Sequence, residues 1–419
     1  PTLLIHTFVI LVLSILSFFP TTNSMATTTT KTTTTDSGQL TSSQKLTDLV
    51  DTIFPSSQII HAFGYGSGVF SQGQNHQPGM LDVILVVQDA QVFHWENQAK
   101  NPSHYATWLR SVDPQGYVAA GLQRCFLGGI DGKVLFHVIE DPIPLKYGVI
   151  QYEDFIQDLT QWTSLYIAGR LHKPTLTIPL STTTSTPAWL EFQEPMQQAQ
   201  HANLQAAVAA AMLLSPLHSP TISWLEFYSK IASLSYTGDF RMQVGAEDPH
   251  KIAKLVQTPG QLERFHALYR GDDESNSSSS SSSSRHDDKD AFTHHGILQS
   301  FEQMGLLSIG TNGLEWDPSN MNARNQFLQK LPLAVQKPLL STSSLSSRFC
   351  STSQPNPSGN DDASMTAAQQ QQQSLTKILE SIVAPAARYQ SFKGLFTFGL
   401  RKSIKYASAK LSKGLLRKR

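Results

Sequence analysis

The spacing of apolar residues separates an early region with strand-like runs from a later region with a helical period. Apolar residues between 46 and 53 recur at three- and four-residue intervals and predict a short amphipathic helix. Longer apolar runs predict strands at 59–63, 80–87, 134–139 and 146–150. The run at 80–87 (MLDVILVV) carries only one charge, which is typical of a strand buried on both faces.

Helical spacing dominates the other ordered segments, apart from a further short strand expected at 125–127. The helices that this spacing predicts are 91–110, 152–168, 204–214, 224–234, 249–257 and 260–269. We therefore expect an α+β fold, in which a domain with a mixed sheet precedes a small, mainly helical domain.

Biased segments and prolines indicate where the ordered regions end. A Ser/Thr cluster at 181–186 with prolines on both sides, the last of them Pro195, indicates a linker. Leu3–Phe19 is apolar but marginal for a membrane span, and Met25 is a candidate initiator. The expected division is 1–44 targeting, disordered or artefactual; 45–185 sheet domain; 186–270 helical domain; 271–292 disordered acidic and serine loop; 293–338 helical extension; 339–374 low-complexity linker; and 375–419 basic amphipathic tail.

Charge is distributed unevenly along the 419 residues. Lysine plus arginine equals aspartate plus glutamate at 32 each, but residues 385–419 hold ten basic residues and no acid. The remainder carries 22 basic against 32 acidic residues, a formal −10, so the tail is expected to have an anionic partner of its own. Two cysteines, Cys125 and Cys350, exclude a disulfide framework and a cysteine-based zinc site, and they favour a reducing compartment.

A glycine-rich turn followed by an acid in a buried strand is the main chemical signal. Gly64, Gly66 and Gly68 alternate after the first strand, a pattern that fits neither the dinucleotide fingerprint nor the P-loop. Nucleotidyltransferases need a strand, a Gly-Ser turn whose N–H groups hold a triphosphate, and a carboxylate that binds Mg²⁺. Asp82 is a candidate for that carboxylate, although the turn by itself is also compatible with a purely structural role.

Six separated segments occur in the same order in one known family. They are HAFGYGSGVF (61–70), MLDVILVV (80–87), NPSHY (101–105), KYGVI (146–150), LYIAGRLHKP (165–174) and YTGDFRM (236–242). With the tail segment 391–411, they resemble the mitochondrial phosphatidate cytidylyltransferases, also called translocator assembly and maintenance proteins. The resemblance covers roughly 45–270 and 375–419.

This resemblance implies a nucleotidyltransferase-like domain followed by a winged-helix-like domain. It implies synthesis of CDP-diacylglycerol and pyrophosphate from CTP and phosphatidate, which feeds cardiolipin and phosphatidylglycerol synthesis. It also implies a peripheral location on the matrix side of the mitochondrial inner membrane.

Several residues carry over from the family's motifs. Gly66, Ser67 and Gly68 match the turn that binds the CTP phosphates, and Asp82 matches the catalytic acid that holds Mg²⁺ or another divalent cation. The basic and acidic residues that lie within matching motifs, and are expected to bind substrate, are Lys146, Arg170, Lys173, Asp239 and Arg241. CTP and phosphatidate bring about six negative charges together, more than Mg²⁺ alone neutralises, so bases are needed. A solvated helix end for Arg170 and Lys173, and an internal Asp239–Arg241 ion pair, are the alternatives.

A second metal-binding acid is not evident, because position 84 is isoleucine. The candidates are Asp89, Asp131, Glu140 and Asp141, of which Asp89 matches an acid common in the family. Elsewhere, His104 and Tyr105 are compatible with substrate contact or with a structural helix start, and His294-His295 with a solvated pair.

The C-terminal tail has the pattern of a helix that lies on an anionic membrane. Leu400, Ile404, Ala407, Leu411 and Leu415 fall on one helical face. The bases expected to contact the membrane from elsewhere on this helix are Arg401, Lys402, Lys405, Lys410 and Lys413. No interleaved aromatics suited to base stacking occur, so no nucleic acid is expected as a partner.

Two alternative functions remain open at this point. One is a nucleotidyltransferase with another acceptor, either RNA or a protein. The other is a non-catalytic, membrane-associated assembly factor, which the missing acid at position 84 favours.

Overall fold

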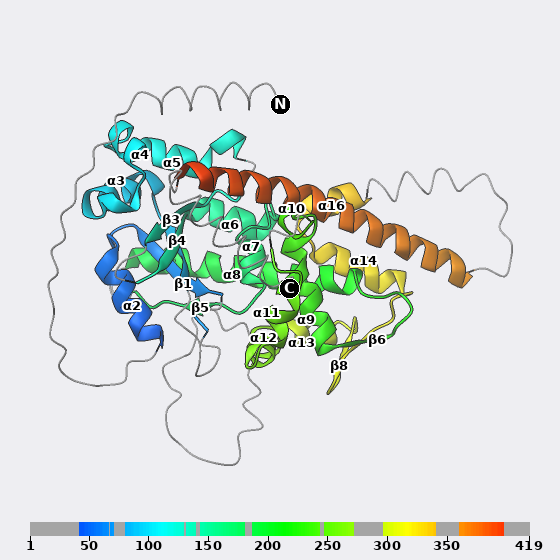
Figure 1. Ribbon diagram of the computed structural model, residues 1–419. Helices are drawn as coiled ribbons and strands as arrows, with labels where there is room; N and C mark the ends of the chain where they lie inside the picture. The colour runs from blue at the N-terminus through cyan, green and yellow to red at the C-terminus, as the bar shows by residue number, and fades with distance from the viewer. Residues whose placement is uncertain are drawn as a thin grey trace, which may run out of the picture. The chain divides into compact units, whose positions relative to one another are not determined.

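The structure is a computed structural model that describes residues 42–66, 68–70, 80–129, 131–139, 143–180, 187–243, 247–271, 296–340 and 360–397 (Figure 1). These residues form an α+β architecture with a five-stranded and a three-stranded sheet, as the sequence predicts. Within the described parts of the chain, no helix is both long enough and apolar enough to cross a bilayer.

The larger sheet has the strand order β3-β4-β2-β1-β5. Its strands are β1 (Ile59–Tyr65), β2 (Leu81–Val87), β3 (Leu135–Ile139), β4 (Leu145–Gln151) and β5 (Leu176–Thr177). The central strands β2 and β4 are parallel, whereas the other neighbours are antiparallel. The four strands predicted from long apolar runs are therefore confirmed.

Helices cover both faces of this sheet, which explains why β2 is apolar at nearly every position. Val83, Leu85 and Val87 pack on one side with residues of α2 and α3, whereas Ile84 and Val86 pack on the other with residues of α6 and α8. The helices around the sheet are α2 (Ser42–Ile53), α3 (Ala90–Lys100), α4 (Thr107–Val112), α5 (Tyr117–Arg124), α6 (Tyr152–Gln161) and α7 (Ala168–Leu171).

Three predictions in this region are wrong in detail. The helix predicted over 91–110 is divided, because α3 ends at Lys100, a 3-10 turn follows at 102–104 and α4 begins only at Thr107. The strand expected at 125–127 lies instead in a 3-10 turn, η2 (Phe126–Gly128), which is followed by Gly129 with a left-handed φ of 71°. The helix predicted over 152–168 ends at Gln161, because Trp162 adopts a left-handed φ of 53°.

The second region has one hydrophobic core, shared by several helices and a small sheet. The helices are α8 (Pro187–Leu213), α9 (Trp224–Ser233), α10 (Phe240–Gln243), α11 (Lys251–Gln257), α12 (Gln261–Arg270), α13 (Ile297–Gln303) and α14 (Met321–Lys330). The sheet has the order β6-β8-β7, from β6 (Thr221–Ser223), β8 (Gly313–Glu315) and β7 (Ser308–Ile309). Pro195, expected in a linker, lies inside α8.

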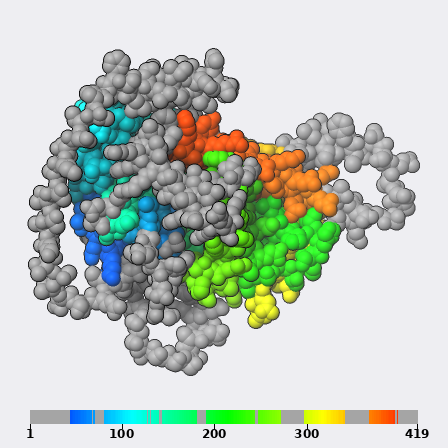
Figure 2. Space-filling view, in the orientation of Figure 1, coloured from blue at the N-terminus to red at the C-terminus, as the bar shows by residue number. Residues whose placement is uncertain are grey.

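The helix α16 (Asn360–Thr397) joins the two regions. It begins within the segment expected to be a low-complexity linker, and Leu375, Leu379 and Val383 pack into the core of the helical region. In Figure 2 the orange part of this helix lies next to the green part of the chain. Near the end of α16, Gln390 Nε2 donates to the Val134 carbonyl beside β3 at 2.8 Å. The expected membrane tail therefore includes a packed helix up to Thr397, and residues 398–419 lie outside the described residues.

Candidate functional site

Three strands bring Tyr65, Asp82 and Lys146 into one row across the sheet. Asp82 pairs with Tyr65 of β1 on one side and with Lys146 of β4 on the other. Residues directly opposite one another on neighbouring strands point to the same face of a sheet. The row therefore lies at one end of the sheet, on the face that α6 and α8 cover.

Asp82 is near a cation but not in tight contact with it. The Asp82 Oδ1 atom lies 3.9 Å from Lys146 Nζ, and the two side chains are 27% and 20% exposed. Burial raises the pKa of the Asp82 carboxyl, and the charges of Lys146, Arg170 and Lys251 offset part of this rise. These charges thus offset only part of the cost of burying the carboxylate, and the side chain stays partly exposed.

Arg170 reaches the same row from α7. Its guanidinium carbon lies 4.1 Å from the ring centroid of Tyr166 and 5.0 Å from that of Tyr65. Its Nη1 donates to the Tyr166 carbonyl at 2.6 Å, whereas its buried Nε has no hydrogen-bond partner in the structure. Burial acts to lower the pKa of Arg170, but Tyr166 and Tyr65 outweigh it and raise the pKa, so the side chain stays charged.

Two further bases lie where the sheet region meets the helical region, Lys173 just after α7 and Lys251 at the start of α11. Lys173 Nζ donates to Ser235 Oγ at 2.9 Å and lies 5.3 Å from the ring centroid of Tyr236. Lys251 Nζ lies 5.4 Å from the same ring and pairs with Glu247 at 3.0 Å. Burial, followed by the charges of Arg170 and Lys251, lowers the pKa of Lys173 to about 7. The charges of Lys146, Arg170 and Lys251 thus act on Asp82, and those of Arg170 and Lys251 act on Lys173. These four bases, Lys146, Arg170, Lys173 and Lys251, are here called the cationic cluster.

Three residues of this site were not predicted from the sequence, namely Tyr65, Tyr166 and Lys251. Tyr65 and Tyr166 lie inside the motifs HAFGYGSGVF and LYIAGRLHKP, close in sequence to Gly66 and Arg170. Their place in these motifs could have identified them as candidate site residues. Lys251 belongs to no motif, and only the tertiary structure brings it to the site.

The glycine turn also lies beside Asp82. Gly66 has a left-handed φ of 79°, and a Cβ added there would lie 3.5 Å from Asp82 Oδ2. At Gly68 an added Cβ would lie 2.2 Å from the Met80 carbonyl oxygen, so that glycine is required for packing. Ser67 lies outside the described residues.

Asp239 and Arg241 form the internal ion pair that the sequence left open. Arg241 Nε and Nη2 donate to the Asp239 carboxylate at 3.1 and 2.6 Å, and Asp239 is 1% exposed. This pair satisfies Asp239 within the protein. Arg241 remains close enough to Tyr166 to act on the pKa of its hydroxyl.

Asp89 does not join Asp82. It caps α3, where its carboxylate accepts hydrogen bonds from the backbone of Gln91 and Val92 at 2.8 and 3.0 Å. Seven residues of extended chain place it roughly 20 Å from Asp82, beyond the other end of β2. Asp82 and Asp89 are therefore too far apart to bind the same metal ion.

Of the other candidate acids, Asp131 is not brought to Asp82. Asp131 contacts Lys393 of α16, and Glu140 and Asp141 lie outside the described residues. Ile139, which precedes them, ends β3 opposite Leu145, at the end of the sheet where Asp82 lies. The described residues contain no group of three or more His, Cys, Asp or Glu side chains suited to hold a metal.

The NPSHY histidine and tyrosine have structural partners. His104 Nδ1 lies 3.0 Å from the Tyr147 hydroxyl, and the Tyr105 hydroxyl lies 2.8 Å from His94 Nδ1. This supports the structural alternative for both residues. His294-His295 lies outside the described residues.

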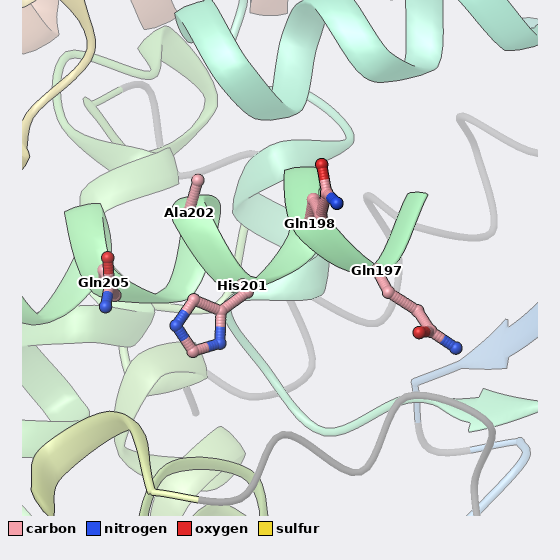
Figure 3. Close-up of a pocket in the computed structure, with 5 residues that line it drawn as sticks. All are labelled: Gln197, Gln198, His201, Ala202 and Gln205. Atoms are coloured by element: carbon pink, nitrogen blue, oxygen red, sulfur yellow. The ribbon is translucent and has the colours of Figure 1, made fainter. Parts of the chain in front are cut away.

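An open pocket along α8 shares no residue with the cationic cluster (Figure 3). Its lining comes from Gln197, Gln198, His201, Ala202 and Gln205, all on one helix (Figure 3). Glutamine and alanine side chains, with one histidine whose pKa burial lowers, do not provide the positive charge that a triphosphate requires.

Comparison with known proteins agrees with the motifs. The family model described as phosphatidate cytidylyltransferase, mitochondrial, matches residues 46–413. Proteins of that name from Rattus norvegicus and Mus musculus are 32% and 31% identical over 360 residues, which cover 84% of this chain and 89% of theirs. One from Caenorhabditis briggsae is 36% identical over 219 residues, and there the match spans 52% of this chain and 61% of the relative. The chain belongs to the mitochondrial phosphatidate cytidylyltransferase family.

Proposed function

We propose that this protein transfers the cytidylyl group of CTP to phosphatidate, with CDP-diacylglycerol and pyrophosphate as products. Membership of the family supports this proposal. The structural observation that carries it is the cationic cluster beside Asp82. Among the described residues, no carboxylate forms an ion pair with Arg170, and its Nε donor is unpaired. Buried donors without partners are rare in folded proteins, so an anionic ligand is the natural occupant.

Asp82 fits the role of a ligand for Mg²⁺ or another divalent cation. Its carboxyl has a raised pKa, its side chain is partly exposed, and the backbone of Gly66 lies beside it. Oxygen ligands of this kind suit a hard cation that also contacts substrate phosphates. The bound cation would neutralise part of the triphosphate charge.

The chain's own residues account for positioning and charge neutralisation. Phosphatidate is a phosphomonoester with a second pKa of about 6, so its oxygen is already anionic near neutral pH and needs no general base. That oxygen forms a bond to the α-phosphorus of CTP while the bond from this phosphorus to the bridging oxygen breaks, and pyrophosphate leaves. Lys146 and Arg170 would hold the phosphates, and the turn at Gly66 would let backbone approach them.

The fold assignments behind this proposal are finer than the α+β class. The row of Tyr65, Asp82 and Lys146 on a mixed sheet supports a nucleotidyltransferase-like first domain. The small sheet packed with α9 supports a winged-helix-like second domain.

The proposed acceptor lies in a bilayer, so the enzyme has to dock on a membrane. We expect residues 398–419 to bind the anionic matrix face of the mitochondrial inner membrane, through the apolar stripe and bases predicted from sequence. Lys393 is only 1% exposed and contacts Asp131, so a deletion that tests docking should begin at 398. Removing 398–419 should abolish binding to cardiolipin-containing liposomes but preserve turnover of short-chain phosphatidate. Full liposome binding by the truncated protein would contradict the docking proposal.

The activity itself is tested with purified protein, labelled CTP, Mg²⁺ and phosphatidate in mixed micelles. The expected products are labelled CDP-diacylglycerol and pyrophosphate. Parallel reactions with RNA or with protein as the acceptor should stay unlabelled. Labelling of either in place of the lipid, or no product from any acceptor, would reject the proposal.

A further inference from the structure

The carboxylate of Asp158, in the last turn of α6, organises the loop that carries Tyr166 and leads into α7, on which Arg170 lies. Asp158 is 2% exposed and accepts six hydrogen bonds. Its Oδ1 accepts from the Thr163 hydroxyl, from the Ser164 backbone and hydroxyl, and from the Leu165 backbone, at 2.8 to 3.1 Å. Its Oδ2 accepts from the backbones of Ile167 and Ala168 at 2.9 and 3.0 Å.

These bonds hold the backbone on both sides of Tyr166. The Tyr166 N–H itself donates to Ser164 Oγ at 3.2 Å, and this hydroxyl in turn donates to Asp158. Every backbone N–H from 164 to 168 is therefore directed to Asp158 or to a side chain that Asp158 holds. A carboxylate with several backbone donors stabilises its charge without a basic partner.

The loop needs this support because its conformation is unfavourable. Trp162 and Leu165 both have left-handed φ angles, 53° and 54°, which bulky L-residues rarely adopt. Such residues persist only where surrounding contacts fix them, and they concentrate at functional sites. Here the Leu165 N–H is one of the donors to Asp158, and the Trp162 N–H bonds to the Asp158 carbonyl at 2.9 Å.

The loop determines where Arg170 of the cationic cluster lies. Arg170 lies over the Tyr166 ring and bonds to the Tyr166 carbonyl, so the position of residue 166 sets that of the guanidinium. On the other side, an added Cβ at Gly132 would lie 2.4 Å from the Tyr166 ring, which shows how closely the ring is packed. A rotation of the 164–168 backbone would therefore move Arg170 away from Asp82.

We propose that Asp158 is a positioning residue, which fixes the 162–168 loop so that Tyr166 and Arg170 face the Asp82 carboxylate. It acts through Arg170 and need not touch substrate. The catalytic part of this inference rests on the proposed function, whereas the structural part does not.

The structure supplies a matched control on the same helix. Asp154, one turn earlier in α6, is also buried, and its carboxylate is held by Arg124 Nε and Lys133 Nζ at 2.8 and 2.9 Å. It makes no bond to the 162–168 loop in the structure. Asp158→Asn and Asp154→Asn are the same chemical change at two buried positions, and only the first places an amide NH₂ against the loop donors.

The first arm measures hydrogen exchange in the peptide covering 162–170, without substrate. Asp158→Asn should speed exchange there, whereas Asp154→Asn should leave it close to the wild-type rate. If Asp158→Asn does not fold, Ser164→Ala removes the bond to the Tyr166 N–H and should speed exchange at that amide. Wild-type exchange rates in the folded Asp158→Asn protein, or in Ser164→Ala when it is the substitute, would overturn the proposal.

The second arm measures CTP turnover in single and double variants. Asp158→Asn should lower kcat/KM about 100-fold, and Asp154→Asn should not. In an Arg170→Met background, Asp158→Asn should cause little further loss, because both changes remove the same interaction. Losses that multiply in full would show that Asp158 does not act through Arg170 and would overturn the proposal. No turnover by wild type would instead reject the proposed function, and the exchange arm would still decide the role of Asp158 in the loop.

Discussion

The two ends of the main sheet differ in how closely a buried carboxylate is paired with basic side chains. Beyond the carboxyl end of β4, both oxygens of Asp154 are paired with bases below 3 Å, and the carboxylate is 5% exposed. At the other end, Asp82 is 27% exposed and its ion-pair partner, Lys146, lies at 3.9 Å. Arg170 beside it is held by aromatic rings and one carbonyl.

This difference indicates that the charges around Asp154 stabilise the fold, whereas those around Asp82 are suited to bind a ligand. A closed network such as Asp154 with Arg124 and Lys133 satisfies its hydrogen bonds internally. An open set of like-charged bases around a partly desolvated acid raises the electrostatic energy of the free protein, and binding of an anion with a cation relieves it.

Asp82→Asn should have the largest effect. Turnover of CTP should fall by at least about 10²-fold, since the carboxylate proposed to hold the divalent cation at the reacting phosphates is removed. Because burial raises the pKa of Asp82, its stabilising contribution is present below the ordinary aspartate pKa and is lost as pH rises through the raised value. At pH 7.5 the variant should therefore unfold at the same or a higher denaturant concentration than wild type.

Asp154→Asn should reverse that pattern. Loss of two charge-assisted hydrogen bonds should destabilise the protein by about 2 kcal/mol, with turnover per folded molecule close to wild type. Denaturant titrations and initial rates on the same preparations measure both quantities. A large loss of stability in Asp82→Asn, with activity retained, would remove the distinction between the two ends.

Gly66→Ala should weaken CTP binding by about tenfold or more, because a left-handed φ opposes any side chain and the added Cβ would approach Asp82. Gly121→Ala is the control, since an added Cβ there meets no atom within 4 Å. The CTP concentration dependence of turnover measures the effect. Equal KM values for the two variants would make the Gly66 turn a structural feature only.

Lys173 should give the smallest effect, a pH-dependent heat of binding. Its pKa of about 7 leaves it partly neutral at pH 7.5, and a bound triphosphate should raise that pKa, so binding should take up a fraction of a proton. Calorimetry in buffers of different ionisation enthalpy measures this uptake. It should vanish well below pH 7, where Lys173 is already protonated, and in Lys173→Met. Uptake that persists in Lys173→Met would assign the proton to another group.

The sequence predicted the parts of this picture that depend on local pattern. The run MLDVILVV identified β2 and placed Asp82 within it, because a strand covered on both faces is apolar throughout. The motifs also brought Gly66, Lys146 and Arg170 into consideration before their proximity was known. The sequence pattern gave the wrong structure where tertiary contacts decide it. The glutamine-rich part of α16 was expected to be a linker, but it is helical, and Gln371 accepts a hydrogen bond there from buried Arg324.

Spacing alone also could not locate the partners of each charge. Asp89 follows the right strand but lies past its far end, where it caps α3. Lys251 and Asp158 belong to no recognised motif, and their roles depend on a helix packing and a loop conformation that only the folded chain defines.

The most direct test of the open cationic cluster is the affinity for CTP, measured by calorimetry with Mg²⁺ present. The comparison is between Arg170→Met, at the end of the sheet where Asp82 lies, and Arg124→Met, at the end where Asp154 lies. Arg170→Met should weaken binding at least about tenfold, and Arg124→Met should bind CTP as wild type does. Equal affinities in the two variants would contradict the assignment of the Asp82 end as the nucleotide site.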